Sequence, residues 1–232
     1  MPSVGMQRFA VLMLVIGALV SAGARRAQGP PPWPDTFTAR VEALALMQTL
    51  NASILASRSS TATLEGWCGA HALADPARIV ADAVAGGAAA PSPQQLQHLE
   101  VASTAEVKYR HVRLRCGSHV LSEADNWYVP ARLTAEMNRV LDTTDAPFGR
   151  VVAPLEPYRR TFSMTLLWSP LPAGWERDSP LPAAAGRVLA IPAALFEHRA
   201  LLYTRENRPF SEVREVYQRG VLEFPAPRPH GG

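Results

Sequence analysis

Hydrophobic and polar positions follow a different period in each half of the chain. In the first half, apolar residues recur at helical spacing from Asp35, which can cap a helix, to Ala56. Ser59 opens a second, shorter segment in which Glu65 is placed to complete a capping box, and Pro76 suits the first turn of a third. The first half is therefore predicted to hold three helices and then a linker, at 35–56, 59–67, 75–86 and 88–93.

In the second half, apolar and polar residues alternate, which predicts strands because successive side chains of a strand point to opposite faces. We expect two hairpins and a further strand, at 107–116 with 119–129, 199–204 with 210–218, and 161–168. The inward side chains expected in the last of these are Phe162, Met164, Leu166 and Trp168. Apolar residues from Leu133 to Leu141 predict a helix between the hairpins. The pattern predicts an α+β fold, with a single antiparallel sheet flanked by helices.

Two charged residues fall on strand faces that should be buried. Arg110 shares its face with Val112 and Leu114, and Glu215 shares its face with Val213. A charge on a buried face costs free energy unless a partner offsets it. Either the two residues pair with each other, or they line a pocket for a polar ligand. On the opposite face of the last strand, Glu212 and Arg214 are expected to form an exposed pair, and residues 109, 111, 113 and 115 are expected to be solvated.

The composition is that of one globular domain, with 232 residues, 47% of them hydrophobic and 19% charged. The formal net charge is only +3, and no basic stripe is interleaved with aromatic residues, so a nucleic-acid partner is not expected. The histidines show no ligand spacing and there is no paired C-x-x-C, so no metal is expected. No G-x-G-x-x-G, Walker or G-x-S-x-G motif indicates a cofactor or a serine nucleophile.

The N-terminus has the pattern of a secretory signal peptide: Arg8, a short apolar run at 9–20, and small residues up to Ala24. Cleavage there predicts an exported, periplasmic protein. The two arginines at 25–26 leave open an uncleaved membrane anchor, and a misplaced start site would leave the protein in the cytoplasm. The predicted parts are a signal peptide or anchor, a proline-rich leader, one domain and a flexible tail, at 1–24, 25–34, 35–222 and 223–232.

The chain contains two cysteines, Cys68 and Cys116. In an oxidising compartment they can form one disulfide, which would contribute about 4 kcal/mol of stability in the chain-entropy model. The alternative is a pair of buried thiols. A nucleophilic cysteine needs a neighbouring histidine and an electropositive, accessible setting, and nothing local singles out either residue for that role.

Several short motifs recur in a recognisable order: Tyr-Arg-His-Val-Arg-Leu at 109–114, Val-Leu-Ser-Glu-Ala-Asp-Asn-Trp-Tyr-Val-Pro at 120–130, Ala-Pro-Phe-Gly-Arg at 146–150, Tyr-Arg-Arg-Thr at 158–161, and Arg-Pro-Phe-Ser-Glu-Val-Arg-Glu-Val-Tyr at 208–217. In order and spacing they resemble the chorismate pyruvate-lyase family over roughly residues 36–222. The resemblance implies a cofactor-free, monomeric lyase that eliminates pyruvate from chorismate and leaves 4-hydroxybenzoate, a ubiquinone precursor. It also implies a ligand pocket buried beneath helical flaps.

The resemblance assigns roles to individual residues. Arg110 falls on the family arginine that holds the substrate carboxylate, and Glu215 falls on the glutamate that meets the ring hydroxyl. Phe148 replaces a leucine in a turn whose backbone touches the ligand. Apart from the resemblance, Arg160 or its neighbour Arg159 is expected to meet the second carboxylate of chorismate; the alternative for each is a solvated arginine beside a proline-rich turn. A guanidinium offers a planar, bidentate fork for a carboxylate. Since aromatisation drives the elimination, positioning away from water would supply much of the catalysis.

Two positions remain open in this alignment. Glu212 replaces Glu215 as the family glutamate if the strand contains a bulge, because a one-residue shift exchanges the two faces. Ser60 aligns with a ligand-contacting methionine of the family, in a poorly matched region.

Two further functions compete with the lyase. A non-catalytic binder of small aromatic acids on the same fold fits export better, because chorismate is made in the cytoplasm. A structural protein, in which Arg110 and Glu215 pair with each other, needs no ligand. Fold alone does not decide between these functions.

Overall fold

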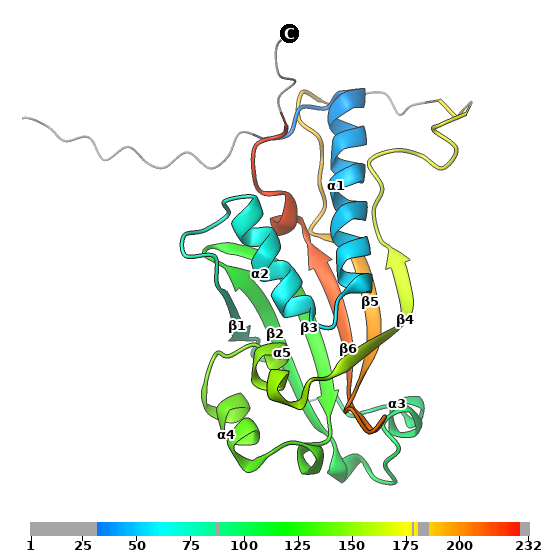
Figure 1. Ribbon diagram of the computed structural model, residues 1–232. Helices are drawn as coiled ribbons and strands as arrows, with labels where there is room; N and C mark the ends of the chain where they lie inside the picture. The colour runs from blue at the N-terminus through cyan, green and yellow to red at the C-terminus, as the bar shows by residue number, and fades with distance from the viewer. Residues whose placement is uncertain (1–31, 87–88, 178, 181–185, 228–232) are drawn as a thin grey trace, which may run out of the picture.

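The computed structural model describes residues 32–86, 89–177, 179–180 and 186–227. The predicted signal peptide, most of the leader and the end of the tail lie outside these residues. Within the described part, the strands are β1 (Ile79–Ala83), β2 (Lys108–Cys116), β3 (His119–Tyr128), β4 (Tyr158–Leu166), β5 (Ala194–Tyr203) and β6 (Pro209–Gln218). They form one six-stranded sheet in the order β1-β2-β3-β6-β5-β4, with every neighbouring pair antiparallel (Figure 1).

The helices are α1 (Phe37–Ala56), α2 (Ser60–Ala70), α3 (Pro93–His98), α4 (Ala135–Thr143) and α5 (Phe148–Val151). Both α1 and α2 lie across the same face of the sheet (Figure 1). The core between them includes Met47 and Leu50 of α1, Leu64 of α2, and Phe196 and Tyr217 of the sheet, all fully buried. The predicted α+β class, with one antiparallel sheet flanked by helices, is confirmed. No helix in the described part is both long and apolar enough to cross a bilayer.

The two long helices begin close to their predicted starts. The cap of α1 is Thr36 rather than Asp35, because the Thr36 side chain accepts a hydrogen bond from the backbone N–H of Ala39 at 3.2 Å. Asp35 instead binds Arg40, with 2.7 Å between Oδ1 and Nε. Ser59 caps α2 as expected.

Two of the local predictions in the first half are wrong. Glu65 completes no capping box; it accepts a hydrogen bond from the backbone N–H of Ile79 at 2.9 Å and pairs with Arg150. The third predicted helix is the edge strand β1, in which only Ile79 and Ala81 are buried. Two inward residues are too few to separate a strand from a helix by periodicity. The helix α3 follows just after, with Ser92 as its cap, where a linker was expected to extend to residue 93.

The second-half hairpins are confirmed as β2–β3 and β5–β6. In the strand predicted at 161–168, Trp168 packs against the core as expected, and Met164 and Leu166 are opposite the buried inner-face residues His198 and Phe196, but the inward prediction is wrong for Phe162. Phe162, Met164 and Leu166 are between 40% and 46% exposed. The register of β4 against β5 shifts between Thr161 and Ser163, and β4 is an edge strand. Phe162 lies at this bulge, and its ring packs 5.2 Å from that of His98 in α3 instead of against α1 and α2.

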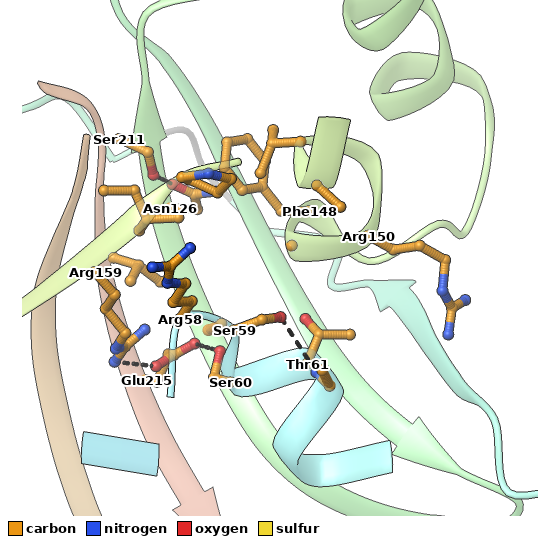
Figure 2. Close-up of a pocket in the computed structure, with 18 of the residues that line it drawn as sticks. Arg58, Ser59, Ser60, Thr61, Asn126, Phe148, Arg150, Arg159, Ser211 and Glu215 are labelled. Carbon is orange, nitrogen blue, oxygen red and sulfur yellow. Dashed lines mark hydrogen bonds and ion pairs between the residues drawn. The ribbon is translucent and has the colours of Figure 1, made fainter. Parts of the chain in front are cut away.

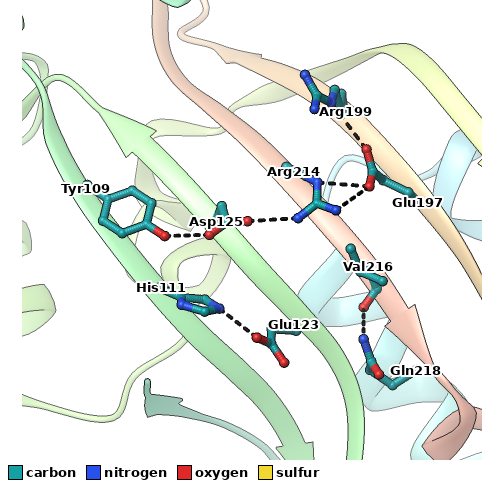
Figure 3. A network of polar contacts seen from close by, with 9 residues as sticks. All are labelled: Tyr109, His111, Glu123, Asp125, Glu197, Arg199, Arg214, Val216 and Gln218. Atoms are coloured by element: carbon teal, nitrogen blue, oxygen red, sulfur yellow. Dashed lines mark hydrogen bonds and ion pairs between the residues drawn. The ribbon is translucent and has the colours of Figure 1, made fainter. Parts of the chain in front are cut away.

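The sheet face opposite α1 and α2 carries a polar network, as Figure 3 shows. Asp125 of β3 accepts hydrogen bonds from the Tyr109 hydroxyl at 2.5 Å and from Arg214 at 3.1 Å. Arg214 also binds Glu197 at 2.7 Å. The expected exposed pair of Glu212 with Arg214 is therefore wrong. Glu212 is buried on this face and binds His98 Nδ1 at 2.7 Å.

A disulfide joins α2 to the sheet. Cys68 of α2 and Cys116 at the end of β2 are bonded and fully buried. The bond closes 48 residues of chain and decides between the two alternatives that the sequence left open. It ties the helix that covers the inner face of the sheet to a strand of that face.

His198 joins α1 to the inner face of the sheet. It lies in β5 opposite Glu215 and is fully buried. Its Nε2 is 2.7 Å from Asn51 Oδ1 of α1, and its Nδ1 has no hydrogen-bond partner in the described part of the chain. Burial lowers the pKa of His198 to about 4, so the ring is neutral at pH 7.

This burial predicts a pH dependence of stability. As the pH falls from 6.5 to about 4, the unfolded chain takes up a proton on His198 that the folded chain does not accept. The stabilisation is therefore complete above about pH 6.5 and is lost on acidification, by roughly 3 kcal/mol in total. In His198→Gln, whose amide keeps a donor for Asn51, urea midpoints should fall less between pH 6.5 and pH 4.5 than in the wild type. Parallel slopes would contradict the prediction.

Candidate functional site

A cavity of about 390 Å³ lies on the inner face of the sheet (Figure 2). Its lining comes from β2, β3, β4, β5 and β6, from the N-terminal end of α2 and from α5. The apolar lining residues include Val112, Leu114, Ala124, Phe148, Val152, Leu202 and Val213. The volume is that of a small-molecule site. A few polar groups interrupt these apolar walls, and they decide what the cavity can hold.

Arg110 projects from β2 into the cavity. Its Nη2 donates to the backbone carbonyl of Ala146 at 3.1 Å, which holds the guanidinium in place. Its Nη1 is buried and has no hydrogen-bond partner among the described residues. Burial lowers the pKa of Arg110 from its usual range, yet an arginine remains charged at any ordinary pH. The cavity lining therefore includes a partly buried cation with one buried, unused donor.

Glu215 of β6 is held entirely by the protein. Its Oε1 accepts from the Ser60 hydroxyl at 2.5 Å, and its Oε2 accepts from Arg159 Nη2 at 2.6 Å and from the Tyr217 hydroxyl at 2.9 Å. The side chains of Arg159 and Glu215 are 3% and 5% exposed. Burial opposes ionisation of Glu215, but the charge of Arg159 and these hydrogen bonds keep its pKa below the usual range. Figure 2 shows the Glu215 carboxylate between Ser60 and Arg159.

The structure brings most of the predicted site residues together. Arg110, Phe148 and Glu215 all line the cavity, whereas Arg160 does not. Arg160 is exposed, and its guanidinium lies 5.8 Å from the centre of the Tyr203 ring. Its place in the predicted site was wrong because neighbouring residues of β4 face opposite sides of the sheet.

The predicted alternatives around Glu215 are also decided. Arg159, the other arginine considered, lines the cavity and is the ion-pair partner of Glu215. A structural pair of Arg110 with Glu215 is therefore wrong. Glu212 lies on the opposite face, so the alternative register is wrong as well.

Sequence reasoning missed three polar residues that shape the site. Ser60 was set aside because its region matched poorly, yet it donates to Glu215. Asn126 and Ser211 line the cavity together, and the Ser211 hydroxyl donates to Asn126 Oδ1 at 2.6 Å. The signal that could have found Asn126 is alternation, which puts it on the same face as Ala124.

The helices α2 and α5 meet at one side of the cavity. A Cβ atom at Gly149 of α5 would lie 2.8 Å from Thr61 Oγ1 of α2, so a larger residue at this position would require the Thr61 side chain to shift. Arg150 donates to Glu65 of α2 and, at 3.1 Å, to the backbone carbonyl of Ile79. No cluster of side chains in the described part could hold a metal ion.

Fold and site together define a single-sheet α+β domain with a cavity whose described lining includes an arginine, Arg110, with a buried guanidinium nitrogen that lacks a hydrogen-bond partner. The chain is 48% identical, over 221 residues, to the uncharacterized protein y4mC from Sinorhizobium fredii (strain NBRC 101917 / NGR234). The match covers 94% of this chain and 93% of y4mC. The chain therefore belongs to the same family as y4mC. No family model matches the chain.

Solved structures of similar fold come from transcriptional regulators. The PhnF effector domain from Mycobacterium smegmatis matches with a TM-score of 0.42 and 14% identity, covering 69% of this chain and 88% of that one. A ligand-binding domain of a GntR-family regulator from Bordetella bronchiseptica matches with a TM-score of 0.39 and 16% identity, covering 60% and 82%. The regulator YydK from Bacillus subtilis subsp. subtilis str. 168 matches with a TM-score of 0.39 and 12% identity, covering 65% of this chain and 62% of that one. At these values the likeness concerns the fold alone.

These findings correct the predicted family and function. No lyase model matches the chain, and the similar structures named above are regulator domains, not chorismate pyruvate-lyases. The assignment as an enzyme that converts chorismate to 4-hydroxybenzoate for ubiquinone synthesis is wrong. The motifs behind it are largely strand residues and turns of this fold, and a fold does not carry its chemistry with it.

The buried pair predicts a non-additive effect on stability. Arg159→Met or Glu215→Leu alone should each lower the free energy of unfolding by about 3–5 kcal/mol, because each leaves one buried charge without its partner. The double variant should be more stable than either single variant. Urea unfolding measures all three.

The exposed pair Glu136–Arg139 of α4 provides the control, and its removal should leave the urea midpoint nearly unchanged. Additive losses at Arg159 and Glu215 would show that the two charges do not depend on each other.

Proposed function

We propose that the protein binds a small organic monocarboxylate in the cavity and holds it without converting it. The observation that carries the proposal is the buried Nη1 of Arg110, which has no partner among the described residues and belongs to a residue that lines an apolar-walled cavity. A buried guanidinium with an unused donor is costly unless an anion completes it. A carboxylate is the planar anion that best fits its fork.

The charges around the cavity support a ligand with one negative charge. Arg159 is neutralised by Glu215, and Arg150 is neutralised by Glu65. Arg58 and Arg110 also line the cavity and have no carboxylate partner in the described part of the chain. Arg58 is exposed to solvent, so the positive charge left unbalanced in the interior of the cavity is that of Arg110. A monoanion would balance it, whereas a dianion would bring a second charge into an apolar site. The apolar walls favour a ligand whose body is an aromatic ring or a short hydrocarbon chain.

The carboxylates around the cavity support binding without chemistry. A general acid or base must be free to exchange a proton with the ligand. Glu215 is occupied by Arg159, Glu65 by Arg150 and Glu156 by Arg205. His198 is neutral and contacts Asn51 instead of lining the cavity. Because these side chains are already engaged in ion pairs and hydrogen bonds, the site favours a binding protein over an enzyme.

Export to the periplasm is part of the proposal. The signal-peptide pattern of residues 1–24 supports it, and so does the disulfide between Cys68 and Cys116, since disulfides persist in oxidising compartments. A fusion of residues 1–30 to alkaline phosphatase, which is active only outside the cytoplasm, should give active enzyme in intact bacteria. The same fusion with Leu14→Arg and Val15→Arg should be inactive. An inactive parent fusion would contradict export.

The binding proposal is tested with simple acids. Benzoate and hexanoate should raise the melting temperature of the full chain and bind in calorimetry, whereas neutral benzamide should do neither. Arg110→Gln should weaken carboxylate binding by about 10- to 100-fold, which is the value of a charged hydrogen bond of about 1.5–3 kcal/mol. Arg110→Lys should retain part of the affinity through its charge.

Arg113→Gln is the matched control, because Arg113 is an exposed arginine of the same strand on the opposite face. It should bind like the wild type. The proposal fails if neither acid binds, or if Arg110→Gln binds them as well as the wild type does.

A further inference from the structure

Asn126 of β3 is a polar residue that lines the cavity beside Arg110. We propose that Asn126 Nδ2 donates a second hydrogen bond to the ligand's carboxylate, beside Arg110, and that Ser211 holds the amide in the orientation this requires. The inference rests on the proposed function and names the residues that recognise the carboxylate. It makes Asn126 a specificity-determining residue that distinguishes a carboxylate from a neutral amide.

The sheet register sets the two donors side by side. Arg110 of β2 and Asn126 of β3 are directly opposite each other, and both line the cavity. Side chains at opposite positions of an antiparallel pair have Cβ atoms about 4.5–5.5 Å apart. A ligand group held by Arg110 is therefore within reach of the Asn126 amide. The two oxygens of a carboxylate can then meet one donor each.

The contact with Ser211 determines which end of the amide is free. Asn126 is 4% exposed, and its Oδ1 accepts from the Ser211 hydroxyl at 2.6 Å (Figure 2). An asparagine amide has one acceptor oxygen and a nitrogen with two donors. With the oxygen directed to β6, the nitrogen remains for the cavity, and no described side chain or backbone group accepts from it. A carboxylate oxygen of a ligand in the cavity would accept a hydrogen bond from this donor.

This arrangement explains the selectivity expected of the site. Arg110 Nη1 and Asn126 Nδ2 are both donors, so the site accepts a group with two acceptors. A carboxamide brings one acceptor and one donor, and its donor would face another donor. The change Asn126→Asp keeps the shape of the side chain but replaces the donor with a negative charge. That charge would pair with Arg110 and leave no net charge for an anion.

Calorimetry with benzoate on the full chain tests the inference. Asn126→Asp should reduce benzoate affinity at least 30-fold. Ser211→Ala should reduce it about 3- to 10-fold, because the amide loses the partner that orients it. Ser122→Ala is the matched control: Ser122 is also a buried serine of the inner face, but it lies outside the cavity lining, so affinity should not change. Melting temperatures without ligand show that each variant is folded.

A second measurement reads Asn126 directly. In ¹H–¹⁵N spectra, the side-chain amide signal that disappears in Asn126→Asp should shift when benzoate is added and stay in place with benzamide. If Asn126→Asp does not fold, this shift in the wild type and the affinity of Ser211→Ala carry the test.

The possible failures are distinguishable. If the wild type binds benzoate and Arg110→Gln does not, but the Asn126 signal and the Ser211→Ala affinity are unchanged, the role of Asn126 is overturned and the carboxylate site stands. If the wild type binds neither benzoate nor hexanoate, the proposed function fails, and the inference fails with it.

Discussion

The buried ion pair between Arg159 and Glu215 is the interaction on which the interior of this protein depends. It joins β4 to β6, and the Ser60 hydroxyl adds the N-terminal end of α2 to the same carboxylate. Because Glu215 is neutralised inside the protein, it does not neutralise Arg110. The net charge that a ligand meets in the cavity therefore depends on the ion pair between Arg159 and Glu215, although the anionic group of the ligand would bind at Arg110.

The two faces of the sheet use similar residues to different effect. On the outer face, Arg214 binds both Asp125 and Glu197, and half-exposed side chains there are partly screened by water. On the inner face, the same kinds of charge are shielded from water, so a charge that has no partner there costs free energy. The guanidinium of Arg110 is informative for this reason, whereas that of the exposed Arg113, three residues later on the opposite face, is not.

The helix α2 connects the cavity to the rest of the fold. Its first turn supplies Ser60 to the site, and its later turns carry Cys68, which is bonded to Cys116 of β2. The close approach at Gly149 brings α5 against the same first turn. The cover of the cavity is thus attached both to the sheet and to its neighbouring helix. A site preorganised in this way loses less free energy to ordering when a ligand binds.

The sequence alone determined the class of fold and the inner position of Arg110 and Glu215, because alternation in β2 and β6 follows from the geometry of a strand. It did not determine the partner of Glu215, since Arg159 is 56 residues away and the bulge in β4 changes which side chains face inward. Nor did it separate the edge strand β1 from a helix. The order of its motifs resembled that of the lyase family because these motifs form the strands and turns of the fold. Function depends instead on which side chains of the cavity remain unpaired. That was decided by tertiary structure, where the register across β2, β3 and β6 places Arg110 opposite Asn126 and leaves both facing the cavity.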